Sequence, residues 1–195
     1  LRALKEQNIM SVLFQQTSAE RLAGSIQTFK VARQALDQAL ADPTWSALPG
    51  QTQYQNKKPA IILDVDETVL DNTAYEARMI LDGTSYPTGW IAWGKEIAAT
   101  EVPGAKEFLN YAHSKGVAIF YITNRVVELK NATQENLTKL GIPWDQSKAT
   151  ILMRGENDWG SDKGSRRRLV GDQHRVLLVI GDNLGDFVDA KDNNL

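Results

Sequence analysis

The first part of the chain has the hydrophobic periodicity of an amphipathic helix. Apolar residues recur there in steps of three and four, interrupted only by Arg33: Leu22, Ile26, Phe29, Leu36 and Leu40. The pattern predicts helix from about Arg2 to Ala41. Asp42-Pro43 should end it, because proline disfavours helical geometry in the preceding residue. A polar linker rich in Gln, Asn and Lys follows over residues 49–59.

Beyond the linker the pattern changes to short, unbroken apolar runs, which are typical of strands buried on both faces. There are four such runs: Ala60–Leu63, Val117–Ile122, Ala149–Met153 and Val176–Ile180. Segments with helical character separate them, and Pro103 and Gly141 supply start and stop signals for two of these helices. The helices are expected near Gly104–Ser114, Val126–Leu140 and Lys163–Val170.

Strands that alternate with helices predict an α/β fold with a parallel sheet and right-handed crossovers. We therefore expect an N-terminal helical segment (residues 1–50) packed on a core that spans residues 59–195. A small, cap-like aromatic insert (residues 71–102) follows the first strand and carries Tyr75, Tyr86, Trp90 and Trp93.

Composition narrows the classes of protein that remain. The chain has 195 residues, 42% of them hydrophobic, which fits one domain with a small accessory part. Its net charge of −2 argues against a general nucleic-acid binder. With no cysteine, disulfides, thiolate zinc sites and cysteine nucleophiles are excluded. No apolar run is long enough for a membrane span. The start at Leu1, without Met, suggests a mature or trimmed form.

Polar residues follow three of the apolar runs directly, and one lysine follows the remaining run after a loop. In open parallel sheets ligands bind beyond the carboxyl ends of the strands, so these residues should share one rim. They are Asp64 and Asp66 after the first run, Thr123, Asn124 and Arg125 after the second, Lys163 after the third, and Asp182, Asn183 and Asp186 after the fourth.

This set suits phosphoryl transfer. Asp64 and Asp66 would face the same way on an extended chain, so that one carboxylate can attack phosphorus while the other protonates the leaving alcohol. Carboxylates this close to each other and to Asp182 need a cation, and a hard oxygen site suits Mg²⁺. Thr123 can donate a hydrogen bond to phosphate, and Lys163 can neutralise the transferring group.

In order and residue type, these motifs resemble those of the haloacid dehalogenase superfamily of phosphatases. The four motifs are Asp64-Val65-Asp66-Glu67-Thr68, then Thr123, then Lys163, then Gly181-Asp182-Asn183-Leu184-Gly185-Asp186. More narrowly, the chain resembles class C bacterial acid phosphatases, the lipoprotein e group of 5′-nucleotidases. The stretches that carry this closer resemblance are Val69-Leu70-Asp71-Asn72, Trp90-Ile91-Ala92-Trp93, Val102-Pro103-Gly104-Ala105 and Phe120-Tyr121-Ile122-Thr123-Asn124-Arg125.

The resemblance implies a Mg²⁺-dependent acid phosphatase with a Rossmann-like core, acting on phosphomonoesters, nucleoside 5′-monophosphates among them. Asp64 would be nucleophile and metal ligand and would form an aspartyl phosphate. Asp66 would be the general acid/base and would bind metal through its carbonyl. Asp182 would be the third protein ligand, and Asp186 would support the metal shell or Lys163. Thr123 and Lys163 would hold phosphate.

The resemblance also bears on substrate binding and location. Asn124, Arg125, Tyr75, Trp90 and Trp93 are the substrate-binding candidates, with a tryptophan stacking on the base. The implied setting is the periplasm or outer membrane of a Gram-negative bacterium, and the implied assembly a homodimer. The chain departs from the family by lacking the lipidated cysteine and by stopping at Leu195, before a further strand that would wall the nucleoside pocket.

Other interpretations of the same residues stay open. A signalling receiver domain also has a phosphoacceptor Asp, Thr and Lys, but does not explain Asp66 or the aromatic insert. A catalytically silent binding or storage protein on the same scaffold is a further alternative. Trp90 and Trp93, three residues apart, could be a buried helix stripe, and the run Arg166-Arg167-Arg168 is expected to be a solvated helix face.

Overall fold

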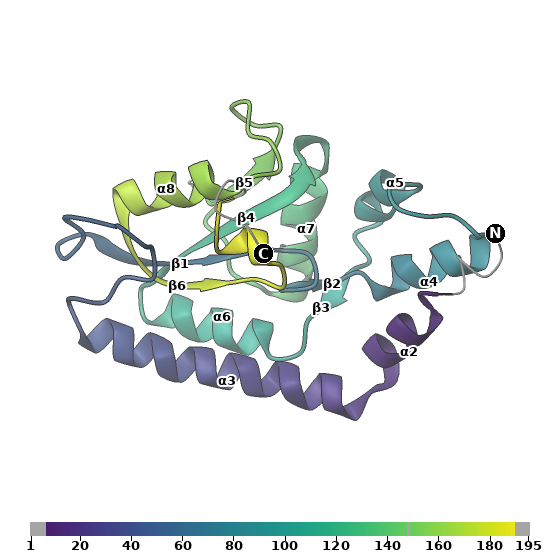
Figure 1. Ribbon diagram of the computed structural model, residues 1–195, viewed down its shortest axis with the longest axis horizontal. Coiled ribbons are helices and arrows are strands. Elements are labelled where there is room, and N and C mark those ends of the chain that lie inside the picture. Colours follow the sequence, from purple (N-terminus) through teal and green to yellow (C-terminus); the bar gives the residue numbers. More distant parts are fainter. Residues whose placement is uncertain (1–6, 148, 190–195) are drawn as a thin grey trace.

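Four parallel strands form the central sheet, in the spatial order β5-β4-β1-β6 (Figure 1). The computed structural model describes residues 7–147 and 149–189. The parallel pairing confirms the predicted α/β fold and brings the carboxyl ends of the strands to one edge of the sheet. The strands are β1 (Lys58–Leu63), β4 (Ala118–Val126), β5 (Ile151–Arg154) and β6 (His174–Ile180).

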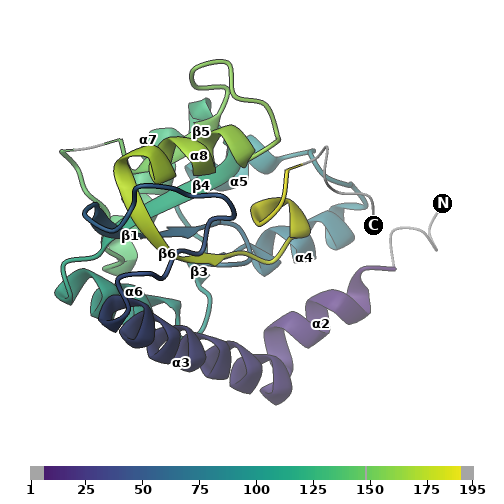
Figure 2. The same cartoon turned by 60° about the vertical axis from the view of Figure 1, so that its left-hand side comes forward.

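Helices cover both faces of this sheet (Figure 2). Successive residues of β1 point to opposite sides. Ile61 and Leu63 lie in the larger apolar cluster, under three helices, whereas Ala60 and Ile62 lie in a smaller cluster that includes Val170. The larger layer contains α3 (Ala19–Ala41), α6 (Ala105–Ser114) and α7 (Lys130–Leu140), and the smaller contains α8 (Gly164–Gln173). Burial on both sides explains why the strands have unbroken apolar sequences.

The N-terminal segment is two helices rather than the single one predicted. They are α2 (Ile9–Thr17) and α3, and Ser18 between them has extended geometry while its hydroxyl accepts a hydrogen bond from the Arg21 amide. A serine in this conformation caps the second helix and breaks the first. The predicted start at Arg2 lies outside the described residues, and the end before Asp42-Pro43 is confirmed.

Long-range packing fixes α3 against the core. Gly104, at the start of α6, has φ +89°, and a Cβ there would lie 3.2 Å from the Ile26 Cα of α3. Glycine suits this position, because it adopts the positive φ without strain and leaves room for α3. Arg33, which breaks the apolar stripe, stacks over the Tyr111 ring at 3.8 Å.

The predicted helix Val126–Leu140 begins later than expected. Val126 continues β4 and pairs with Arg154, and a single 3-10 turn, η1 (Val127–Leu129), precedes α7. The β-branched valines favour this extension of the strand. The third strand begins at Ile151 rather than Ala149, and α8 runs on past the predicted Val170.

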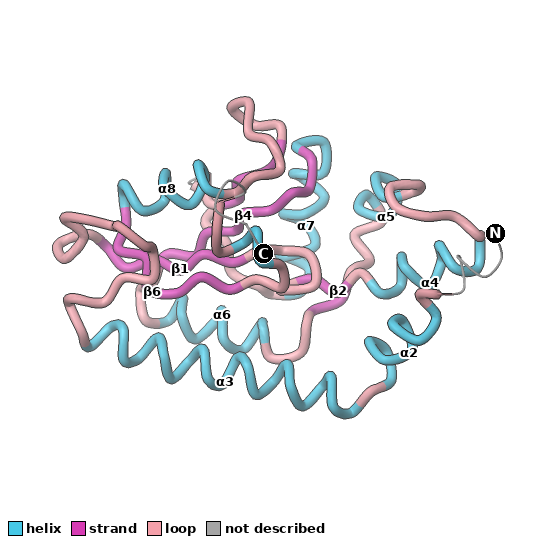
Figure 3. The backbone as a smooth tube through the Cα atoms, in the orientation of Figure 1, coloured by secondary structure: helices cyan, strands magenta, loops and turns pink. Residues whose placement is uncertain are grey.

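The aromatic insert is closed at its base by a two-stranded antiparallel ribbon (Figure 3). It comprises β2 (Leu70–Asp71), α4 (Thr73–Asp82), α5 (Trp90–Lys95) and β3 (Thr100–Glu101). Gly83, in the left-handed conformation, ends α4. In the views of Figures 1 and 2, α4 lies beside α2 and off one end of the sheet. None of the described helices is long and apolar enough to cross a membrane.

Candidate active site

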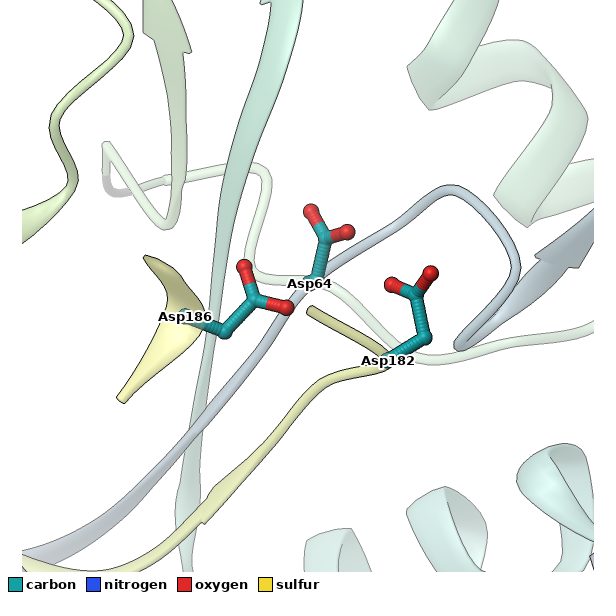
Figure 4. Close-up of side chains that lie close together, drawn as sticks. All are labelled: Asp64, Asp182 and Asp186. Carbon is teal, nitrogen blue, oxygen red and sulfur yellow. The ribbon is translucent and has the colours of Figure 1, made fainter. Parts of the chain in front are cut away.

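Three aspartates from different parts of the sequence meet at the carboxyl end of the sheet. Asp64 follows β1, Asp182 follows β6, and Asp186 lies in the short 3-10 helix η2 (Leu184–Asp186); their carboxylates gather in Figure 4. One oxygen from each lies within 4.8 Å of the others. The Asp64 amide donates to the carbonyl of Ile180 at 3.0 Å, which fixes the position of Asp64 relative to β6.

Lys163 is the cation within this group. Its Nζ lies 2.6 Å from Asp64 Oδ1 and 2.6 Å from Asp186 Oδ1. The lysine is almost fully buried, at 5% exposure, so these carboxylates compensate a charge that water cannot reach. Only its order in the chain had marked this lysine as functional, and the structure places it between two of the predicted site residues.

Asp186 is held in place by its own turn. Its second oxygen accepts the Asn183 amide at 3.0 Å, while Asn183 Oδ1 accepts the Gly185 amide at 2.9 Å. Gly181 makes room for this arrangement, because a Cβ there would lie 2.2 Å from Asp186 Oδ2. Both Asp186 oxygens are thus engaged, which suits a residue that supports Lys163 more than one that binds an ion directly.

The site carries an excess of negative charge, because Asp64, Asp186 and the more exposed Asp182 gather around a single lysine, Lys163. Burial raises the pKa of Asp64 to about 7, with the charge of Asp186 adding to the effect of burial and Lys163 opposing it. Burial also raises the pKa of Asp182. A divalent cation between Asp64 and Asp182 would relieve this charge, and hard carboxylate oxygens are the ligands that Mg²⁺ prefers. The residues present therefore fit a metal.

Asp66 sits beside this group but has different neighbours. Its Oδ1 accepts hydrogen bonds from Arg125 and from Asn72 Nδ2. Next to it, Glu67 has a left-handed backbone, φ 57°, and accepts both the amide and the side-chain N–H of Asn72. Burial, followed by the charge of Asp66, raises the pKa of Glu67 to about 8. Asn72 and Glu67 were missed by sequence reasoning, although both lie within the matched motif stretch.

The end of β4 is anchored from α8. Thr123 is fully buried, its Oγ1 accepts the Arg125 amide at 3.0 Å, and its carbonyl accepts from Arg166 at 2.6 Å. Arg166 also donates to Asn124 Oδ1 and to the carbonyl of Asp162, which precedes Lys163. Asn124, but not Thr123, is among the described residues that line the cavity around the aspartates.

The predicted solvated arginine face on α8 is wrong for two of its three residues. Arg166 is fully buried and Arg167 is 4% exposed, whereas the Arg168 side chain is 63% exposed. Arg167 donates to the Gly185 and Asp186 carbonyls. A helix that covers a sheet must bury one face, and here the buried face holds the loops that carry Lys163 and Asp186. A run of like charges gives no sign of such internal acceptors.

A larger cavity of about 780 Å³ adjoins the aspartates. Asp66, Glu67 and Asn124 line both this cavity and the smaller one around Lys163. Its far wall is aromatic and comes from the insert, with the Tyr75, Tyr86 and Trp90 rings packed edge to face. A phosphate at the aspartates could thus carry its organic group into this space.

The two tryptophans of the insert have separate roles. Trp90 is half-buried and lines the larger cavity, with the Arg125 guanidinium 5.5 Å from its ring. Trp93 is 3% exposed, and its indole N–H donates to Asn72 Oδ1 at 2.9 Å. Trp93 is therefore a core residue and is removed from the stacking candidates. Tyr75 borders the cavity but is 5% exposed, with its hydroxyl bound to the Thr88 carbonyl.

Such a cluster of acids and one lysine, at the carboxyl end of a parallel sheet and under a small insert, defines a phosphatase of the haloacid dehalogenase type. The chain belongs to the HAD superfamily, subfamily IIIB (acid phosphatase), whose family model matches residues 2–194. It is accordingly a phosphomonoesterase.

Two solved structures of the class C acid phosphatase from Bacillus anthracis are similar to the chain throughout. One is 38% identical, with a TM-score of 0.85, and the match covers 100% of this chain and 78% of that one. The other, which has tungstate bound, is 37% identical with a TM-score of 0.83, and the match covers 96% of this chain and 73% of that one. These likenesses confirm the predicted family and fold.

The raised pKa of Asp64 predicts how the thermal stability of the metal-free protein depends on pH. A carboxyl whose pKa is raised on folding stabilises the fold at low pH, and this contribution is lost as pH rises from about 4 through about 7. In the presence of a chelator at about pH 8, Asp64→Asn should therefore melt several degrees above wild type, since 1 kcal/mol is worth about 2–4 °C in a chain of this size. The gain should shrink towards pH 4.

Thermal melts of both proteins across this pH range test the prediction. Asp172→Asn, which changes an exposed carboxylate on α8, is the matched control and should show no such pH-dependent gain. A destabilised Asp64→Asn at about pH 8 would mean that Lys163 already compensates the Asp64 charge in full.

Proposed function

We propose that the protein hydrolyses phosphomonoesters, nucleoside 5′-monophosphates among them, through an aspartyl phosphate on Asp64 and with Mg²⁺. The observation that carries the proposal is the position of the Lys163 Nζ, 2.6 Å from both Asp64 and Asp186, with Asp182 alongside. A lysine so placed can hold phosphoryl charge next to the attacking carboxylate.

The nucleophile in this proposal is Asp64. It lies at the end of a buried strand, its side chain is 11% exposed, and Lys163 orients one oxygen. Attack on phosphorus by its free oxygen forms an acyl phosphate and splits hydrolysis into two steps. Lys163 also favours the ionised form of Asp64, which is the form that attacks, against the opposing effect of burial.

Asp64, Asp182 and the carbonyl of Asp66 are the residues that we assign to Mg²⁺. When bound, the ion would neutralise carboxylate charge and polarise the phosphoryl oxygens. Asp182 is the more exposed of the two carboxylates, and its Oδ1 accepts a long 3.4 Å hydrogen bond from Thr68. Its oxygens therefore remain able to bind an ion, unlike those of Asp186.

The general acid and base in this proposal is Asp66. It lines both cavities, so it stands where the phosphate site meets the space for the organic group. In the first step it would protonate the leaving oxygen, and in the second it would accept a proton from the water that attacks the acyl phosphate.

The aromatic wall supports nucleotides as the substrate class. Trp90 and Tyr86 border the larger cavity, and the Tyr86 residue is 59% exposed, so flat apolar surface is available there. Stacking of a base on an aromatic ring is worth roughly 1–3 kcal/mol in nucleic-acid binders, and every base has such a face. The preference would then be for nucleotides as a group.

Activity should require both Mg²⁺ and Asp64. Hydrolysis of p-nitrophenyl phosphate should be lost in EDTA and restored by excess Mg²⁺, and Asp64→Asn should retain less than about 1% of wild-type kcat, because an amide cannot form the acyl phosphate. Asp172→Asn serves as the carboxylate control. Turnover by Asp64→Asn at wild-type rates would remove Asp64 as nucleophile, and full activity in EDTA would contradict the metal requirement.

Trp90→Ala should raise KM for nucleoside 5′-monophosphates by about 5- to 100-fold and leave KM for glycerol phosphate nearly unchanged, because glycerol has no ring to stack. Steady-state kinetics on both substrates measure the difference between the two changes in KM. Trp144→Ala, which removes a half-buried tryptophan away from the cavity, is the control for lost packing and should lower Tm without a nucleotide-specific effect. Equal KM increases on both substrates would contradict stacking on Trp90.

A further inference from the structure

The hydrogen bonds to the Asp66 carboxylate all end on one oxygen. Within residues 7–147 and 149–189, Oδ1 accepts hydrogen bonds from Arg125 Nε at 2.9 Å and from Asn72 Nδ2 at 2.8 Å, and Arg125 Nη2 lies 2.8 Å from the same oxygen. The other oxygen, Oδ2, receives none of the side-chain donors of these described residues. The two oxygens of this carboxylate are therefore chemically distinct.

The donors are far more deeply buried than the carboxylate that they hold. Arg125 and Asn72 are each 2% exposed, whereas the Asp66 side chain is 23% exposed. A partly exposed aspartate would ordinarily sample several rotamers. Here the buried donors fix its orientation, and a charge-assisted hydrogen bond from arginine is among the stronger ones available in proteins.

Arg125 is committed to the protein interior. Besides Asp66, its guanidinium donates to Thr133 Oγ1 through Nη1 and to Asn72 Oδ1 through Nη2, both at 3.2 Å. All three nitrogens thus have protein acceptors. Arg125 borders the larger cavity, but each of its nitrogens already donates to the protein, which favours a structural role over the substrate-binding role expected for it.

Asn72 is fixed in turn by the core of the insert. Its Oδ1 accepts the indole N–H of Trp93 at 2.9 Å, which orients the amide so that Nδ2 faces Asp66 and Glu67. Besides lining the cavity, the insert therefore orients Asp66. Its buried Trp93 fixes the Asn72 amide, and that amide donates to Asp66.

We propose that Arg125 and Asn72 are positioning residues for Asp66, which hold Oδ1 so that Oδ2 carries the proton exchanged with the substrate. The inference rests on the proposed function of Asp66 as general acid and base. As the bond from phosphorus to the leaving oxygen breaks, the Oδ2 proton passes to that oxygen, and the charge left on the carboxylate is stabilised by Arg125. In the second step Oδ2 takes back a proton from water.

Arg125→Lys tests the proposal, because lysine keeps the charge but cannot donate to Asp66, Asn72 and Thr133 together. General acid catalysis matters most for poor leaving groups. We expect kcat for glycerol phosphate to fall by at least about tenfold and kcat for p-nitrophenyl phosphate by less than about threefold, with KM and the inhibition constant of inorganic phosphate nearly unchanged. Arg78→Lys is the matched control, since the exposed Arg78 lies over the Trp93 ring without touching Asp66.

Two outcomes would overturn the positioning role. Equal losses of kcat on both substrates would show that Arg125 does not act through proton transfer, and a raised inhibition constant for inorganic phosphate would show that it binds phosphate. If Arg125→Lys does not fold in a thermal melt, Asn72→Ala, which removes the second donor to Oδ1, must show the same leaving-group split.

Asp66→Asn separates this inference from the proposed function. It should give the same split as the positioning variants and a larger loss on glycerol phosphate. If Asp66→Asn shows the split and neither positioning variant does, the positioning role is wrong and the proposed function stands. If wild type hydrolyses neither substrate with Mg²⁺, the proposed function itself fails, and the inference fails with it.

Discussion

The site depends on acidic side chains that gather around one buried lysine at the carboxyl end of a parallel sheet. Asp64, Asp182 and Asp186 come within 4.8 Å of one another, and Lys163 compensates only part of their charge. Carboxylates so close destabilise the fold unless a cation joins them. The same excess charge that costs stability would favour a divalent cation, and with it the phosphoryl group that such an ion can hold.

Much of the surrounding architecture serves to hold that charge in place. Arg166 and Arg167 on α8 donate to the Thr123 carbonyl near the end of β4 and to carbonyls of the segments that carry Lys163 and Asp186. On the other side, the insert sends Trp93 inward, where it fixes Asn72, and presents Trp90 to the adjoining cavity. One small module thus supports the acid/base candidate and forms the wall against which the organic part of a substrate can lie.

The sequence predicted those features that depend on local pattern or on chain order. Strands buried on both faces must be apolar throughout, so the four runs located the sheet, and parallel order then placed Asp64, Lys163 and Asp182 at one edge. The burial and contacts of Arg125, Arg166 and the two tryptophans could not be predicted. They depend on partners supplied by distant segments of the chain. A buried arginine and a solvated one look alike in a sequence, as do an indole facing a cavity and one donating to a buried amide.

Calorimetric titration of the metal-free protein with Mg²⁺ tests most directly whether the acidic cluster needs a divalent cation. Because burial holds the pKa of metal-free Asp64 at about 7, ion binding at about pH 7 must displace part of a proton. Measurements in two buffers of different ionisation enthalpy should show saturable binding with proton release that fades towards about pH 9. The absence of saturable binding, or proton release that is unchanged between these pH values, would contradict the account.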